Sequence, residues 1–293
     1  MGRLSLLLVM CLVGASCERE IPPPSDQMIS VGSHRLQIRI EGKGTPTVVI
    51  NAGITDQMDN WRPLQHRVAQ VTRIITTIEL DTGRASPGRC PGTAVARRRE
   101  LKALLDAASV PGPYVIVGHS LGGLNAQVFA AKYPQEVVGI VLLDPPPLSF
   151  IRGEQYTSLL AMADQMTAEW QAVADAGAES TDAEEKARAV FFKMIASEHR
   201  EMFGESARLV SEISSFGDTP LLVMAAKKPN PVLEDLAEEY QEYWIEQSRS
   251  LSHKSSKGKF VLAEESTHHL YKDVPDLVVE SILSVVYQAR GER

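Results

Sequence analysis

Cysteine is scarce in this sequence, whose 293 residues contain three. Two of them, Cys11 and Cys17, stand close to the N-terminus, which leaves Cys90 without a partner in the rest of the chain. A disulfide framework is therefore excluded, and the fold must depend on a buried apolar core. The composition suits such a core, because 44% of the residues are hydrophobic and 23% are charged, as in ordinary globular proteins.

An excess of positive charge is also missing. The formal net charge at pH 7 is −7. Binding to nucleic acid depends on lysines and arginines that neutralise phosphates, so we expect no nucleic-acid partner. The one basic cluster, Arg97, Arg98 and Arg99, lies in a helical stretch, and we expect it to face solvent.

Motifs that bind metals or nucleotides are absent from the sequence. It contains no H-E-x-x-H, C-x-x-C or P-loop pattern, so we expect neither a metal nor another cofactor. Several histidines show no ligand spacing and receive no role at this point: His34, His66, His119, His199 and His253.

The N-terminus carries a short apolar run in place of a long one. Arg3 precedes the run, which covers residues 4–13, and small residues follow up to Cys17. A helix needs about 20 residues to cross a bilayer, so this run is better suited to a signal peptide. Small residues before a cysteine resemble the lipobox of bacterial lipoproteins, in which the cysteine is lipidated. We expect residues 1–17 to be a signal segment, with Cys17 as a lipid anchor in the periplasm or cell envelope. Ordinary signal cleavage without a lipid is the alternative.

Strand and helix patterns alternate along most of the chain. Residues 18–28 contain three consecutive prolines and predict a linker. Residues 36–40 alternate strictly and predict a half-buried antiparallel strand near the edge of the sheet. Further strands are expected at 46–51, 73–80, 114–117, 138–143, 221–225 and 259–262, and helices at 121–133 and 275–289, the latter capped by Asp273. Such alternation predicts an α/β fold, a mostly parallel sheet with helices on both faces.

One long segment, residues 146–216, lacks any strand pattern. We expect it to form a helical cap over a core built from residues 29–145 and 217–293. Helices are expected at 183–199 and 206–215, and an amphipathic one from the spacing of Leu159, Met162, Met166, Trp170 and Val173. These methionines and aromatics fit either internal packing or contact with an apolar ligand.

Ser120 stands at the centre of a G-x-S-x-G motif, Gly118-His119-Ser120-Leu121-Gly122. A predicted strand precedes the motif and a predicted helix follows it, and this context is what gives the motif meaning. Glycine on both sides of the serine lets neighbouring backbones pass in a tight turn without colliding with a Cβ atom.

Residues 112–123 closely resemble the nucleophile elbow of esterase-like α/β-hydrolases, and the Ser266-Thr267-His268-His269-Leu270 segment resembles the loop that carries the histidine in that family. The resemblance extends over residues 29–286 apart from the cap. It implies that Ser120 is the nucleophile and His268 the general base. His269 is the alternative base, disfavoured because the family pattern has a variable and then an apolar residue after the histidine.

A third residue is expected, a carboxylate that orients the catalytic histidine. Its position departs from the commonest family pattern, in which an Asp follows the seventh strand. Here no carboxylate follows that strand until Glu234 and Asp235. The sixth strand ends at Asp144, and some family members use an acid at that place. We favour Asp144 and keep Glu234 and Asp235 as alternatives.

The resemblance also implies an oxyanion site and a reaction. The backbone N–H groups of Ile54 and Leu121 would hold the oxyanion. We expect hydrolysis of a carboxylic ester, with a small and apolar substrate, through an acyl-enzyme. Transfer to another acceptor, amide or peptide cleavage, and a binding protein without catalysis are the alternatives.

Overall fold

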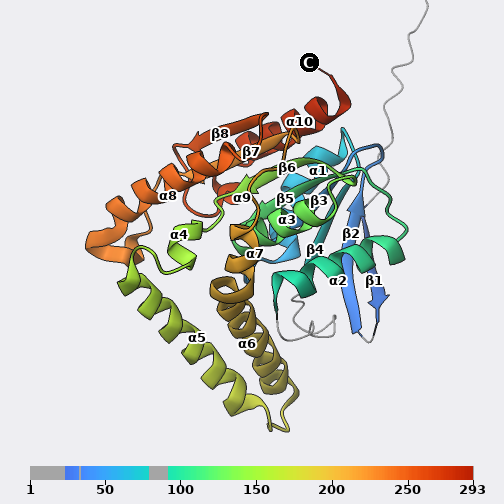
Figure 1. Ribbon diagram of the computed structural model, residues 1–293. Coiled ribbons are helices and arrows are strands. Elements are labelled where there is room, and N and C mark those ends of the chain that lie inside the picture. The colour runs from blue at the N-terminus through green and yellow to red at the C-terminus, as the bar shows by residue number, and fades with distance from the viewer. Residues whose placement is uncertain (1–23, 33, 79–91, 293) are drawn as a thin grey trace, which may run out of the picture.

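A computed structural model describes residues 24–32, 34–78 and 92–292 of the chain. An eight-stranded sheet forms its centre, in the order β1-β2-β4-β3-β5-β6-β7-β8 (Figure 1). The strands are β1 (Ser25–Val31), β2 (His34–Glu41), β3 (Thr47–Asn51), β4 (Ile74–Ile78), β5 (Tyr114–His119), β6 (Val137–Leu143), β7 (Leu221–Ala226) and β8 (Gly258–Ala263). The pairs β1–β2 and β2–β4 are antiparallel and the other five are parallel. The predicted α/β class is confirmed.

The strand β1 was not predicted, and the first strand expected from the sequence, 36–40, lies within β2. Residues 25–28 pair with β2, although they fall within the linker that we predicted. Arg39 explains the difference, because its guanidinium forms two hydrogen bonds with the Asp26 carboxylate at 2.6 and 2.7 Å and holds β1 against the sheet. The signal segment, Cys17 and Cys90 lie outside the described residues.

Both faces of the sheet are covered by helices. On one face α1 (Arg62–Ala69) and α10 (Pro275–Arg290) pack against Val48, Ile50 and their neighbours. On the other, α2 (Ala94–Ala107), α3 (Leu121–Lys132) and α8 (Ala237–Ser252) pack against side chains such as Val49. Because successive residues of a strand point to opposite faces, the almost continuously apolar strands supply both cores.

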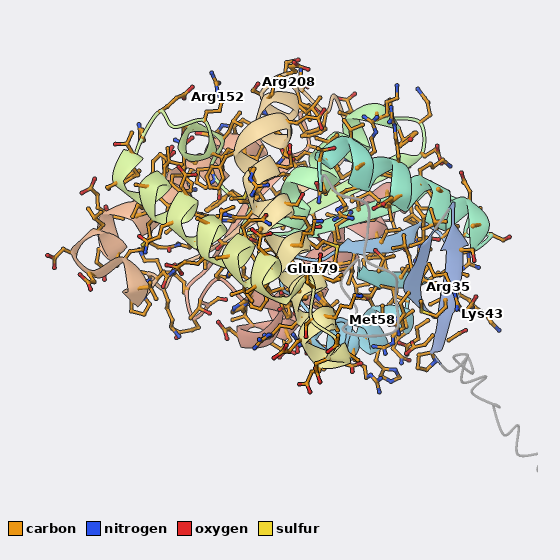
Figure 2. The ribbon with its side chains drawn as sticks, turned by 90° about the horizontal axis from the view of Figure 1, so that it is seen from below. Arg35, Lys43, Met58, Arg152, Glu179 and Arg208 are labelled. Atoms are coloured by element: carbon orange, nitrogen blue, oxygen red, sulfur yellow. The ribbon has the colours of Figure 1, made fainter. Side chains whose placement is uncertain are left out.

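The segment predicted to be a cap, which we call the cap, lies between β6 and β7 in the sequence. It consists of α4 (Leu148–Ile151), α5 (Thr157–Gly177), α6 (Ala183–Glu201), the short π-helix η2 (Met202–Ser206) and α7 (Ala207–Ser211). The long helices α5 and α6 pack against each other and extend away from the sheet, with Glu179 in their connection (Figures 1 and 2). The expected helix at 206–215 is shorter, because α7 ends at Ser211.

The expected apolar stripe of α5 is only partly buried. Its buried residues include Leu159, Ala163, Thr167 and Ala174, whereas Met162, Met166 and Val173 are exposed. Small side chains let α5 and α6 approach closely: a Cβ atom on Gly177 would stand 2.8 Å from that of Ala189. The face of α5 that packs on α6 is therefore the one with small side chains, and the larger Met162 and Met166 stay exposed.

The expectation that the basic cluster is solvated is wrong for Arg97. Its side chain is 2% exposed, and Nη1 donates to Glu100 at 2.8 Å while Nη2 pairs with Glu198 of the cap at 2.5 Å. Arg98 is half-buried and Arg99 is exposed. The base of the cap lies over the start of α2, where the Gly92 amide donates to Ser197 Oγ at 3.0 Å, and this contact removes Arg97 from solvent.

Within the part of the chain that the structure describes, no helix has both the length and the apolar character needed to cross a membrane.

Candidate active site

Ser120 occupies a sharp turn between β5 and α3. Its φ is 52° and its ψ −125°, a region that side-chain-bearing residues rarely adopt. Its N–H donates to the Leu143 carbonyl at 3.0 Å, which ties the turn to the end of β6. Backbone strain of this kind costs roughly 1–3 kcal/mol and persists only where the surroundings enforce it.

Two glycines make the turn possible, as the motif predicted. A Cβ atom on Gly118 would lie 2.5 Å from the Gly122 carbonyl oxygen, and one on Gly122 would lie 2.2 Å from the Asn51 carbonyl oxygen. Real Cβ atoms do not approach backbone so closely, so any side chain at these positions would displace the turn or the loop after β3.

Asp144 lies within hydrogen-bond distance of His268. The distance from Asp144 Oδ2 to His268 Nδ1 is 2.6 Å, and Asp144 Oδ1 accepts the Ala226 N–H at 2.9 Å. Asp144 is 3% exposed and has a φ of 48°. Glu234 and Asp235, the alternative acids, are exposed in the short 3₁₀ helix η3 (Pro231–Leu236).

The loop that carries His268 is held by Asp273. The carboxylate of Asp273 accepts hydrogen bonds from the Thr267 N–H at 2.8 Å and the Thr267 hydroxyl at 2.5 Å. The expectation that Asp273 caps α10 is therefore wrong, because the cap residue is Val274 and no side chain bonds there. His269, the competing base, is exposed and is the N-cap residue of the short helix α9 (Leu270–Asp273).

The two adjacent histidines differ in their electrostatics. Desolvation works against a protonated His268 ring, but the hydrogen bond and charge of Asp144, with the charge of Asp56, raise the pKa of His268 above its usual value. Desolvation and the neighbouring His268 and His119 lower the pKa of His269. The Asp144 bond also leaves Nε2 as the ring nitrogen of His268 that can exchange a proton with a reacting group.

The two residues expected to supply the oxyanion amides belong to segments that reach the Ser120 turn. Leu121 is the first residue of α3, so its N–H has no partner four residues back within the helix. Ile54 follows Gly53, where an added Cβ would lie 3.2 Å from Ser120 Cβ. The loop after β3 therefore contacts the serine turn directly.

A buried polar cluster beside these groups was not predicted from the sequence. It contains Asp56, His119 and Tyr271, which are 6%, 1% and 3% exposed. Asp56 Oδ1 accepts the Tyr271 hydroxyl at 2.7 Å, and Asp56 Oδ2 lies 2.9 Å from His119 Nδ1. No motif signals the cluster, since its members come from the loop after β3, the end of β5 and α9.

Apolar and aromatic side chains gather between the Ser120 turn and the cap. Leu121 and Leu124 of α3 pack with residues of α4, α7 and α8, including Phe150 and Tyr240. The Trp244 ring stands edge-on to that of His268, with centroids 5.9 Å apart. An apolar group bound next to Ser120 would thus meet an apolar wall.

Residues 46–219, more than half of the chain, match the family described as the alpha/beta hydrolase fold. The chain belongs to this family. The expectation of a hydrolase with this fold is confirmed.

Relatives of this α/β-hydrolase include an uncharacterized protein and a lipase. The protein YqjL of Bacillus subtilis is 26% identical over 246 residues, which cover 84% of this chain and 85% of YqjL. The lipase LipV of Mycobacterium tuberculosis is 38% identical over 111 residues, which cover 38% of this chain and 41% of LipV. The match to LipV thus concerns less than half of either protein.

Solved structures share the fold at low identity. A putative lipase from Acinetobacter baumannii aligns with a TM-score of 0.62 and 17% identity over 92% of both chains. The carboxylesterase CesB from Bacillus subtilis aligns with a TM-score of 0.61 and 14% identity, over 90% of this chain and 91% of CesB. At these identities the likeness concerns the fold alone.

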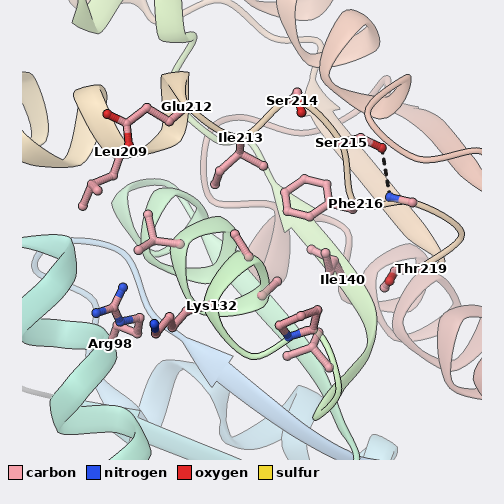
Figure 3. Close-up of a pocket in the computed structure, with 16 residues that line it drawn as sticks. Arg98, Lys132, Ile140, Leu209, Glu212, Ile213, Ser214, Ser215, Phe216 and Thr219 are labelled. Carbon is pink, nitrogen blue, oxygen red and sulfur yellow. Dashed lines mark hydrogen bonds between the residues drawn. The ribbon is translucent and has the colours of Figure 1, made fainter.

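The α/β-hydrolase also has a cavity of about 630 Å³ away from these residues (Figure 3). Its wall includes Lys132 at the end of α3, Ile140 of β6 and Phe216, and contains neither Ser120, Asp144 nor His268. Its size therefore does not mark the site of chemistry. Among the described residues, no group of three or more His, Cys, Asp or Glu side chains could hold a metal ion.

Proposed function

We propose that this protein is a serine hydrolase that cleaves a carboxylic ester, with Ser120 as nucleophile, His268 as general base and Asp144 as the orienting acid. The observation that carries the proposal is the 2.6 Å contact between Asp144 and His268. The backbone carbonyl of His268 lies 2.9 Å from the ring of His119, the residue before the strained Ser120. The lipase and carboxylesterase among the similar proteins are consistent with an ester.

The reaction has two halves. His268 Nε2 accepts the proton of the Ser120 hydroxyl while Oγ attacks the ester carbonyl, and the amides of Leu121 and Ile54 stabilise the oxyanion. The intermediate collapses, and the alcohol leaves with the proton from His268. Water, deprotonated by His268, then attacks the acyl-enzyme, and the carboxylic acid and free Ser120 result. The apolar wall around Phe150 and Tyr240 favours an apolar group on the substrate.

Labelling with a fluorophosphonate tests the nucleophile. We expect covalent modification of Ser120, located by peptide mass spectrometry, and no modification of Ser120→Ala. Nitrophenyl esters of increasing acyl length would then define the substrate range. An unlabelled, inactive protein would favour a binding role. Ester or amide products that appear when an alcohol or amine is added would favour acyl transfer.

We further propose that the protein is exported and anchored through Cys17. The support is the charged start, the short apolar run and the small residues before Cys17. Mass spectrometry of protein from its native host should show a chain that begins at a lipidated Cys17. Intact Met1 would refute export. Unchanged membrane partitioning of Cys17→Ser would refute lipidation alone.

A further inference from the structure

A second carboxylate–imidazole pair lies beside the one formed by Asp144 and His268. Asp56 accepts three hydrogen bonds or close contacts: Oδ1 from the Tyr271 hydroxyl at 2.7 Å, and Oδ2 from the Gly53 N–H at 2.8 Å and from His119 Nδ1 at 2.9 Å. The other ring nitrogen of His119, Nε2, lies 2.9 Å from the backbone carbonyl oxygen of His268. All three side chains of the cluster are buried, and the ester-cleavage steps assign none of them a role.

The hydrogen-bond partners of His119 indicate which of its two ring nitrogens carry a proton. A backbone carbonyl oxygen only accepts hydrogen bonds, so Nε2 must carry a proton. Burial by itself would raise the pKa of the Asp56 carboxyl, but the hydrogen bonds from His119, Tyr271 and Gly53 lower it to about 2. The Tyr271 hydroxyl and the Gly53 N–H both donate to Asp56, so His119 Nδ1 also faces an accepting oxygen. Both ring nitrogens of His119 thus face acceptors, which is the geometry of an imidazolium paired with a carboxylate.

The pair contacts three of the segments that form the candidate site. Asp56 binds the amide of Gly53, the residue before the oxyanion donor Ile54. His119 directly precedes Ser120 and binds the backbone of His268. The ring centroids of His119 and His268 are 4.9 Å apart. One buried ion pair thus connects the oxyanion loop, the nucleophile turn and the histidine loop.

We propose that the buried Asp56–His119 ion pair is a positioning device that holds the His268 backbone and the oxyanion loop in register with Ser120. The inference rests on the proposed esterase function. Neither residue contacts the reacting atoms, so both act through others. An unpaired charge inside a protein is costly. This pair is stabilised by further hydrogen bonds, because Asp56 also accepts from Tyr271 and Gly53 and His119 Nε2 faces the His268 carbonyl.

The surroundings leave the pair little freedom. Trp61 stacks on Tyr271 with centroids 4.0 Å apart and stands edge-on to His119 at 6.0 Å. A Cβ atom on Gly53 would lie 2.8 Å from His119 Nδ1. Rigid packing of this kind can hold groups to within a fraction of an ångström, which is the precision that a catalytic constellation needs.

The pair should also be visible in the titration of His268. The charged or titratable groups that face His268 are Asp144 from the end of β6, Asp56, His119 of β5 and His269 beside it, while Tyr240 of α8 approaches Asp144. If the His268 backbone loses its anchor, its contact with Asp144 lengthens. Because that contact and the charge of Asp56 both raise the pKa of His268, the acid limb of the kcat profile should move to lower pH when Asp56 loses its charge.

Asp56→Asn tests the proposal, since it removes the charge and keeps the shape. We expect kcat on a nitrophenyl ester to fall roughly 10- to 100-fold, as for a small misplacement of reacting groups, with KM within about threefold. The acid limb should move to lower pH. The double variant Asp56→Asn/His119→Gln should be no slower than the slower single variant, because both remove one device. Ile75→Val, a core change in β4, is the control for destabilisation and should alter neither kcat nor the limb.

Nitrogen NMR of ¹⁵N-histidine protein supplies a readout that does not depend on catalysis. The wild type should show two protonated ring nitrogens for His119, assigned by their loss in His119→Gln, and Asp56→Asn should show one. A singly protonated ring in the wild type would overturn the ion pair. Unchanged kcat in Asp56→Asn and in His119→Gln, or a fall in kcat with an unmoved acid limb, would overturn the positioning role. Absence of hydrolysis and labelling in the wild type would instead refute the esterase function.

Discussion

His268 Nδ1 lies 2.6 Å from Asp144 Oδ2, and the other Asp144 oxygen accepts the N–H of Ala226 at 2.9 Å. Asp144 follows β6 and Ala226 ends β7, so the acid from one strand is fixed by the backbone of its neighbour. The N–H of Asp144 also donates to the Met224 carbonyl at 2.7 Å. Both oxygens of the carboxylate are thus committed, and its orientation toward His268 is set before any substrate binds.

Replacement of Asp144 by asparagine tests its charge, because the substitution removes the charge and keeps the shape of the side chain. We expect Asp144→Asn to lower kcat by about 10⁴, because the amide no longer fixes the reactive tautomer of His268 or stabilises the imidazolium. Steady-state kinetics on a nitrophenyl ester measures the loss, and circular dichroism should show an unchanged fold. Glu234→Gln and Asp235→Asn are the matched controls and should stay within a few-fold of wild type. Full activity of Asp144→Asn would exclude it as the acid.

Adjacent histidines allow a direct test of the base. We expect His268→Ala to lower kcat by about 10⁴ and His269→Ala by about tenfold or less. The reason is that only His268 contacts Asp144, whereas His269 is exposed. The same assay on the two purified variants decides between them, and the reverse order would assign the base to His269.

The pH dependence of activity follows from the raised pKa of His268. The base must be neutral to accept the proton of Ser120, so activity is lost as the pH falls through this pKa. Asp144 raises the pKa above its usual value near 6.5. We therefore expect the acid limb of the kcat/KM profile to lie above pH 6.5. A limb at or below pH 6 would contradict the electrostatic role of Asp144.

Local sequence patterns, together with the resemblance to α/β-hydrolases, were enough to predict where the candidate site residues lie in the fold. Ser120, Asp144 and the His268 loop each follow a strand, and the ends of neighbouring parallel strands meet at one edge of the sheet. The steric role of Gly118 and Gly122 could be predicted for the same reason, since it depends on a turn of five residues.

Contacts between distant segments could not be predicted in this way. Asp56 meets His119 and Tyr271 across 63 and 215 residues of sequence, and none of the three carries a motif of its own. Periodicity likewise identified the helix around Met162 but not the face that packs, because that face depends on the small residues of α5 and α6.

The buried Arg97 offers a test of how the cap is held. We expect Arg97→Met to destabilise the protein by roughly 3–5 kcal/mol, because it leaves the carboxylates of Glu100 and Glu198 buried without this partner. Arg99→Met, on the same helix but exposed, should change stability by less than about 0.5 kcal/mol. Urea denaturation of both variants measures the difference. Equal stabilities would show that the contact between Arg97 and the cap contributes nothing.

His199 in the cap should make stability fall in mild acid. Its ring is 6% exposed, with Thr167 Oγ1 2.6 Å from Nδ1 and the rings of Trp170 and Phe203 edge-on at 5.3 and 5.2 Å. Desolvation lowers the pKa of His199 to about 4, although the charge of Asp164 opposes this slightly. The folded protein therefore keeps His199 neutral at a pH where the unfolded chain, with a pKa near 6.5, is already protonated.

The sign of the effect follows from proton binding. Between about pH 6.5 and 4 the unfolded state binds a proton that the folded state does not, so the free energy of unfolding decreases as the pH falls. Over the whole window the loss approaches about 3 kcal/mol, at about 1.4 kcal/mol for each unit of pKa difference. Urea denaturation of the wild type and of His199→Gln at pH 7.0, 6.0, 5.0 and 4.5 measures it. The glutamine variant lacks the titrating ring, so the difference in unfolding free energy between the two proteins should shrink as the pH falls. A difference that stays constant over this range would show that His199 takes up its proton equally well in the folded cap.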